Sequence, residues 1–124
     1  MAVNSYRDLI VWQKAMNLVE DSYRLAKLFP KSETYGLAGQ MQRAAVSIPA
    51  NIAEGHGRDH LGDYRRHRSI ANGSLMELET HLQIAIRLGY LHPTQLDSVQ
   101  HQASEVGRML AGLSRKLKAR QPET

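Results

Sequence analysis

Cationic side chains gather at two places in the sequence, and both have the chemistry to bind phosphates. The two clusters are Arg65, Arg66 and Arg68, and then Arg115, Lys116, Lys118 and Arg120. The 124-residue chain carries a net charge of +4, and no acidic residue lies between Arg108 and Arg120. Lysine and arginine neutralise phosphates and release counterions, which gives affinity with little sequence readout. We therefore expect a nucleic-acid-binding surface, although cations at the end of a helix also complement its dipole.

A second candidate is a line of polar residues within one predicted helix. Its members, spaced by four, four and three residues on one face, are Arg43, Ser47, Asn51 and Glu54. Arginine and asparagine suit contacts with phosphates or base edges, and Glu54 can orient the arginine. The line also fits a polar seam inside the bundle or between subunits, in which Arg43 and Glu54 satisfy each other or the backbone of a neighbour. We favour the seam, because charged networks in helical assemblies usually fix register.

No residue set predicts catalysis, a cofactor or a metal. Cysteine is absent, which excludes thiol chemistry and cysteine-ligated metals. His56 and His60 have helical metal-ligand spacing, but the glycines around them predict a helix end rather than one shared face. No strand-turn-helix elbow and no glycine-rich phosphate loop after a strand can be read. We expect a protein that is not an enzyme.

The elements that carry these residues are four amphipathic segments separated by short glycine or proline breaks. They cover residues 6–29, 36–56, 63–88 and 94–118, and a short frayed tail follows. The pattern predicts one all-α domain, 1–124, and the short connections predict an antiparallel up-down-up-down four-helix bundle. Ser5 and Asp8 form a candidate capping box for the first helix, and Pro49 predicts a kink in the second.

The first helix is apolar around more of its circumference than an isolated bundle needs. One stripe contains Leu9, Trp12, Met16, Val19, Tyr23 and Ala26, and the other contains Val11, Ala15, Leu18, Ser22, Leu25 and Phe29. Such a broad face would be wet in a monomer. We infer that it meets another subunit, or else a different protein.

No stretch approaches the length of a membrane span, and residues 1–8 lack the features of a signal peptide. We expect a cytoplasmic protein without membrane contact. Aromatic platforms for stacking bases are few, since Tyr6, Tyr64 and Tyr90 are the plausible surface rings.

Several longer motifs are spread along the chain, of which the most specific are Asn51-Ile52-Ala53-Glu54-Gly55, Gly73-Ser74 with Glu77, Val11-Trp12-Gln13-Lys14-Ala15 and Leu88-Gly89-Tyr90-Leu91. With these motifs nearly the whole chain resembles the four-helix bundle family of 23S rRNA intervening-sequence proteins. The resemblance implies a bacterial homopentamer of antiparallel four-helix bundles with no catalytic activity. Some relatives are accessory proteins of diversity-generating retroelements that bind nucleic acid and a reverse transcriptase. Relatives tend to be apolar or aromatic where this chain has His67 and Arg68, so either the third helix packs later or that end is open for a ligand.

Two functions follow as expectations. The first is a non-enzymatic homo-oligomer, a pentamer by the resemblance, that binds RNA or DNA through its clustered cations and is mainly directed to RNA. The second is a scaffold that docks a partner protein such as a reverse transcriptase, with no direct nucleic-acid role.

Overall fold

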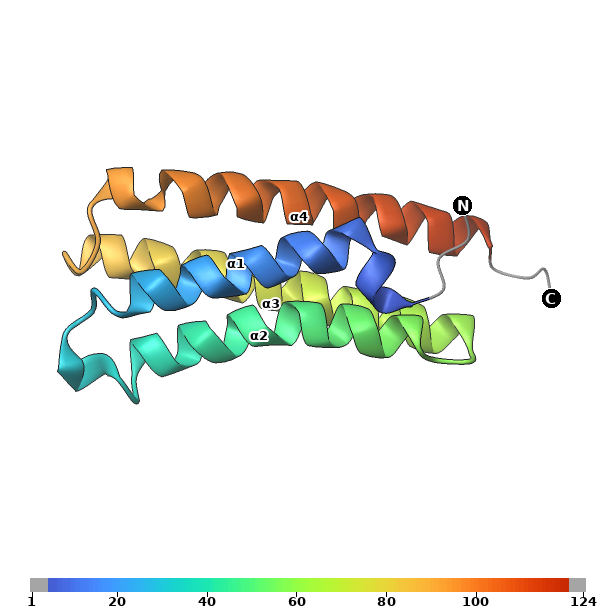
Figure 1. The fold of residues 1–124 in the computed structure, drawn as a ribbon, viewed down its shortest axis with the longest axis horizontal. Helices are drawn as coiled ribbons and strands as arrows, with labels where there is room; N and C mark the ends of the chain where they lie inside the picture. Colours follow the sequence, from blue (N-terminus) through green and yellow to red (C-terminus); the bar gives the residue numbers. More distant parts are fainter. Residues whose placement is uncertain (1–4, 121–124) are drawn as a thin grey trace.

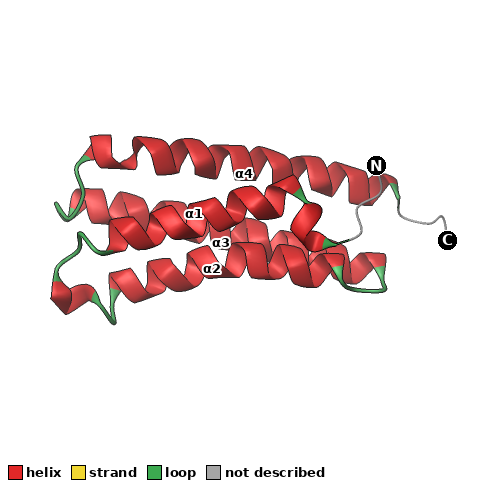
Figure 2. Cartoon of the chain, viewed as in Figure 1, coloured by secondary structure: helices red, strands yellow, loops and turns green. Residues whose placement is uncertain are grey.

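The fold is built entirely from helices in the part of the chain that the computed structural model describes, residues 5–120 (Figure 2). The long helices are α1 (Ile10–Ala26), α2 (Leu37–His56), α3 (Leu61–Arg87) and α4 (Pro93–Ala119), and two short 3-10 helices are η1 (Tyr6–Asp8) and η2 (Lys31–Glu33). The predicted all-α class with four long helices is confirmed. None of the described helices combines the length and the apolar character that a membrane crossing requires.

The four helices lie side by side along the long axis of the molecule (Figure 1). Helices α1 and α3 each pack against α2 and α4, so α1 and α3 are diagonal to one another. The α2–α3 connection and the end of α4 lie at the same end of the bundle, and the other two connections lie at the opposite end (Figure 1). This arrangement brings the start of α3 beside the end of α4.

The start of α1 differs from the predicted start near Tyr6. The Ser5 hydroxyl accepts a hydrogen bond from the Arg7 backbone N–H at 3.2 Å, so the predicted cap serves η1 alone. Leu9 then has an extended backbone (φ −71°, ψ 124°), and α1 begins at Ile10. The Tyr6 ring packs edge-on against Trp12, with ring centroids 5.3 Å apart. Helix η1 therefore covers part of the apolar surface of α1 that the sequence predicted to exceed the needs of the core.

One apolar stripe of α1 forms the core, and the other is divided between core and solvent. The buried members are Val11, Ala15, Leu18, Ser22 and Leu25, followed by Phe29 after the helix. On the second stripe Trp12 and Val19 are half-buried, whereas Met16 and Tyr23 remain 38% and 40% exposed. The surplus apolar surface is therefore smaller than predicted, but it persists next to α2.

Helices α2 and α3 form the tightest pair in the bundle. Helix α2 runs without a break through the buried Pro49, so the expected distortion does not interrupt the helix. A β-carbon on Gly55 would lie 2.9 Å from the His67 β-carbon and 3.1 Å from the Tyr64 ring. Glycine is therefore required at position 55, and this close approach fixes the first turns of α3.

The ends of α3 and α4 carry local stop and start signals. Gly89 has a φ of +79°, a left-handed conformation that glycine adopts readily, and it ends α3. His92 and Gln95 cap the start of α4 reciprocally, with Pro93 at the first helical position. Residues 119 and 120 are described as the end of α4 and its cap, and the remainder of the predicted tail lies outside the described residues.

Candidate nucleic-acid interface

The two predicted cationic clusters meet in one surface depression, which we call the cationic hollow. It has a volume of about 350 Å³ and is lined by Gly62, Arg65, Arg66, Arg68 and Ser69 of α3 and by Ser114 and Lys118 of α4. The lining contains four cationic side chains and two hydroxyls but no carboxylate. A phosphate in the hollow would meet charged and neutral hydrogen-bond donors together.

The core residues of α3 determine which of its arginines face the hollow. Tyr64, His67 and Ala71 are buried, and these positions alternate by three and four along one helical face. Arg68 is half-buried, and its guanidinium donates to the backbone carbonyl of Leu110 on α4 at 3.4 Å. Arg68 therefore holds the two walls of the hollow together as well as carrying charge.

The cationic side chains near the end of α4 lie on different faces of the helix. Leu117 is fully buried, and Lys118, the next residue, lines the hollow. Lys116 is exposed but lies two positions from Lys118, and residues at that spacing do not share a helix face. Arg115 is exposed on the adjoining outer surface of α4. The second sequence cluster is thus split, and only Lys118 lines the hollow.

Arg120, the cap of α4, lies near the Tyr64 phenol. Burial raises the pKa of Tyr64, and the positive charge of Arg120 opposes this rise. Tyr64 is only 9% exposed, so it is not the surface ring that the sequence suggested. Arg120 borders the cationic end of the bundle without lining the hollow.

The helix dipoles at this end oppose one another. The start of α3 presents partial positive charge and the end of α4 presents partial negative charge, each equivalent to about half an elementary charge. The lining of the hollow contains cationic side chains and no carboxylate. Within the described residues, neither Arg66 nor Lys118 has a carboxylate within ion-pair distance. Full charges on side chains therefore outweigh the partial charges of the helix ends in the lining of the hollow.

The predicted polar line divides into two groups. Ser74 of α3 donates to Ser47 at 2.8 Å, and the Asn51 amide donates back to the Ser47 carbonyl at 2.9 Å. These residues form a seam between α2 and α3. Within one chain Arg43 and Glu54 do not pair, because eleven residues separate them by about 16 Å along a helix. Glu54 instead pairs with Arg58 at 2.7 Å.

His67 packs into the same seam. It is 5% exposed, and its Nδ1 lies 2.9 Å from Asn51 Oδ1 and 3.7 Å from Glu54 Oε2. Of the two alternatives for this unusual position, late packing of α3 is therefore wrong, since the helix is already packed at Tyr64 and His67. The cationic hollow lies on the arginine side of α3.

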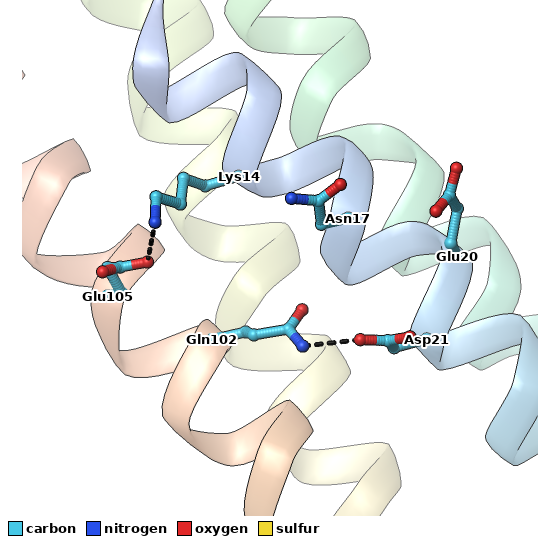
Figure 3. Close-up of a pocket in the computed structure, with 6 residues that line it drawn as sticks. All are labelled: Lys14, Asn17, Glu20, Asp21, Gln102 and Glu105. Carbon is cyan, nitrogen blue, oxygen red and sulfur yellow. Dashed lines mark hydrogen bonds and ion pairs between the residues drawn. The ribbon is translucent and has the colours of Figure 1, made fainter.

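A second depression, the acidic hollow, lies between α1 and α4 (Figure 3). It has a volume of about 340 Å³ and is lined by Lys14, Asn17, Glu20, Asp21, Gln102 and Glu105. Lys14 pairs with Glu105 at 2.9 Å, and the Gln102 amide donates to Asp21 at 2.5 Å. The hydrogen bond from Lys14, with the nearby cations His101 and Arg108, lowers the pKa of Glu105. Sequence reasoning missed this site because its two halves lie about 85 residues apart.

A third depression, which we call the tyrosine groove, lies over the outer surface of α2. It has a volume of about 500 Å³ and is lined by Tyr23, Thr34, Tyr35, Gly39, Gln42, Arg43, Val46 and Ser47. Tyr35 is 95% exposed, whereas Tyr90 is half-buried and donates to Glu33 at 2.7 Å. The exposed ring is therefore Tyr35, which the sequence did not single out. Among the described residues, no three histidine, aspartate or glutamate side chains are grouped closely enough to hold a metal ion.

These features define a class, a cysteine-free four-helix bundle with a cationic hollow at one end. The family model of the 23S rRNA-intervening sequence protein matches residues 7–112, and the chain belongs to this family. Its fold is similar to the crystal structure of a protein of unknown function from the S23 ribosomal protein family of Bacteroides thetaiotaomicron. That comparison has a TM-score of 0.78 and 24% identity, and covers 85% of this chain and 98% of the other. No curated protein matches the chain.

Proposed function

We propose that the protein is a non-enzymatic, homopentameric nucleic-acid-binding protein, directed mainly to RNA, that recognises phosphates with little sequence specificity. The observation that carries the proposal is the cationic hollow. Its α3 and α4 walls are about 50 residues apart in the sequence, yet they present four cations and no carboxylate to one volume. Such a surface attracts a polyanion by counterion release.

Local structure alone accounts less well for this arrangement. Cations in the last turn of α4 complement its dipole. Arg65 and Arg66 lie beyond the first turn of α3, which contains the acidic Asp63, so the helix dipole does not explain their position. A ligand phosphate offers a reason for arginines that share one depression with Lys118.

The assembly part of the proposal rests on exposed apolar side chains and on the family resemblance. Exposed apolar residues on three helices include Met16, Tyr23, Val46, Ile70, Met76 and Ile84. Exposed apolar surface is often covered by a partner, and a closed ring would pool the cations of its subunits. Light scattering on a sizing column should give the mass of five 14.0 kDa chains. A monodisperse 14.0 kDa particle at micromolar concentration would contradict the ring.

The binding proposal is tested with a labelled structured RNA and two matched variants. Arg66→Gln/Lys118→Gln removes two cations from the hollow, and Lys27→Gln/Arg87→Gln removes two exposed cations elsewhere. Fluorescence anisotropy at low and moderate salt should show affinity that falls with salt, and a clear loss in the first variant alone. Equal behaviour of the two variants, or binding indifferent to salt, would refute the proposal.

The tyrosine groove favours one alternative function, a scaffold that docks a partner protein such as a reverse transcriptase. A tyrosine that is 95% exposed beside Arg43 and Val46 has the composition of a protein-binding hot spot. Under this alternative, Tyr35→Ser abolishes capture of the partner, whereas Arg66→Gln/Lys118→Gln has no effect. Under the nucleic-acid proposal, Arg66→Gln/Lys118→Gln weakens RNA binding, whereas Tyr35→Ser has no effect on it.

A further inference from the structure

The outer face of α4 carries a line of basic side chains, two arginines and an imidazole, that continues from the cationic hollow. His101, Arg108 and Arg115 are all exposed and follow one another at intervals of seven residues. Seven residues are nearly two full helical turns, so these side chains lie on one face along the helix axis. Lys118 is one turn beyond Arg115 and lines the hollow. We call this line, together with the hollow, the cationic track.

The helix dipole does not account for the whole track. Its effect is confined to the last turn of a helix, where Lys116 and Lys118 lie. Arg108 lies three turns before the end of α4 at Ala119. Within the described residues, Arg108 has no carboxylate within ion-pair distance.

Carboxylates border the track without interrupting it. Between Asp97 and the end of α4 the sequence has a single acidic residue, Glu105. Glu105 pairs with Lys14 at 2.9 Å and so is held toward α1, although the charges of His101 and Arg108 also reach it. Asp97 is exposed one turn before His101 and ends the track on that side.

The length of the track indicates the form of the ligand. From Arg108 to Lys118 the helix rises about 15 Å, and from His101 about 25 Å, at 1.5 Å per residue. A compact anion would fit within the hollow and would not reach Arg108. A duplex presents one phosphate per about 1.7 Å of axis, so a strand along α4 passes several phosphates over the same distance.

We propose that the ligand is an extended nucleic-acid strand laid along α4, with Arg108 and Arg115 as phosphate-contacting residues in addition to the hollow. This inference rests on the proposed function and goes beyond it, because it assigns a direction and a minimum length to the bound strand. A free nucleotide or a single phosphate would leave Arg108 without a role.

The test uses a fluorescein-labelled 15-nucleotide single-stranded RNA and a trinucleotide, with anisotropy measured across a salt series. Arg108→Gln/Arg115→Gln should lower the slope of log affinity against log salt by about 1.4 for the longer RNA, at about 0.7 per phosphate contact on single strands. The trinucleotide should bind this variant and the native protein equally. The control Lys27→Gln/Arg87→Gln should retain the native slope for both probes.

Three outcomes overturn the inference. If Arg108→Gln/Arg115→Gln behaves as the control while Arg66→Gln/Lys118→Gln still loses affinity, the track is wrong and the proposed function stands. If the native protein binds neither RNA in a salt-dependent manner, the cationic track and the proposed function are both wrong. If a 15-residue oligoglutamate binds as tightly as the RNA and loses as much affinity in the variant, the occupant is an acidic peptide.

Discussion

The acidic hollow and the cationic hollow lie on opposite sides of α4 and differ in the charges that line them. On the α1 side, the acidic hollow contains both signs of charge, and the Lys14–Glu105 ion pair and the Gln102–Asp21 hydrogen bond join its two walls (Figure 3). On the α3 side, the cationic hollow contains one sign of charge and no lining carboxylate. The comparison teaches that depressions of similar volume can differ in electrostatics, because side chains of opposite charge join two helices whereas a lining of one sign favours an ion of the other sign.

The largest expected effect comes from the core of the helix that both sites share. Leu110 is fully buried, and its backbone carbonyl accepts a hydrogen bond from the Arg68 guanidinium. Leu110→Ala should lower the free energy of unfolding by about 3–5 kcal/mol, the usual cost of a buried leucine cavity. Urea denaturation measures this cost. A loss below about 1 kcal/mol would mean that α4 does not hold the two sites together as described.

A smaller, one-sided effect is expected at the α2–α3 contact. Gly55→Ala places a methyl group 2.9 Å from the His67 β-carbon, so α3 must shift at a cost of about 1–3 kcal/mol. The shift should weaken RNA binding at the cationic hollow while the Lys14–Glu105 pair persists.

Gly73→Ala is the matched control for this prediction, because a β-carbon there meets nothing within 4 Å. It should stabilise α3 by about 0.5–1 kcal/mol through helix propensity alone. Thermal unfolding of the two variants gives the change in the free energy of unfolding for each substitution. Equal signs for the two substitutions would contradict the close contact at Gly55.

Two lysines separated by one residue sharpen the comparison further. Lys118→Gln should weaken RNA binding about two- to fivefold, in the range of an exposed ion pair, and lower the salt slope by about 1. Lys116→Gln removes the same charge from another helix face and should change the slope less. Salt-dependent anisotropy on a structured RNA compares them. A larger effect at Lys116 would show that the hollow is not the binding surface.

The smallest effect is expected from pH in the acidic hollow. The pKa of Glu105 in the folded protein is lowered from 4.5, first by its hydrogen bond with Lys14. A depressed pKa stabilises the fold above the unfolded value, and this contribution is lost as the pH falls below 4.5 through the folded pKa. Glu105→Gln should therefore reduce the decline in melting temperature below that pH, as followed by circular dichroism. An unchanged acid profile would indicate that the pair contributes nothing measurable.

The sequence predicted most of the helical architecture because helix signals are local. In α3 the buried row contains Leu75, Leu78 and Leu82, and in α4 it contains Val99, Val106 and Leu110, at intervals of three, four or seven residues that place each row on one helical face. Local signals were also where the prediction failed in detail. The cap at Ser5 was read correctly as a cap, but it begins a single 3-10 turn, because Leu9 is extended and packing of Tyr6 on Trp12 turns the chain.

The candidate site was predictable only as separate pieces. Arg65, Arg66, Arg68 and Lys118 were selected from charge clustering, but their meeting depends on how α3 and α4 are aligned. The rotation of α4 about its own axis places Lys116 on another face, and the packing of α2 against α3 brings His67 against Asn51. Tyr35 could not be found, because nothing in its sequence neighbourhood distinguishes an exposed ring from a buried one.

The sequence by itself determined four amphipathic helices, one cysteine-free domain, a net positive charge and two cationic clusters, because each depends on composition or on a period of a few residues. The tertiary structure decided which apolar stripe of α1 became core, which cations share the hollow, and which charges on α4 are compensated. These outcomes depend on the relative rotation and axial position of neighbouring helices. Packing of side chains from distant parts of the chain sets both quantities, so no local pattern contains them.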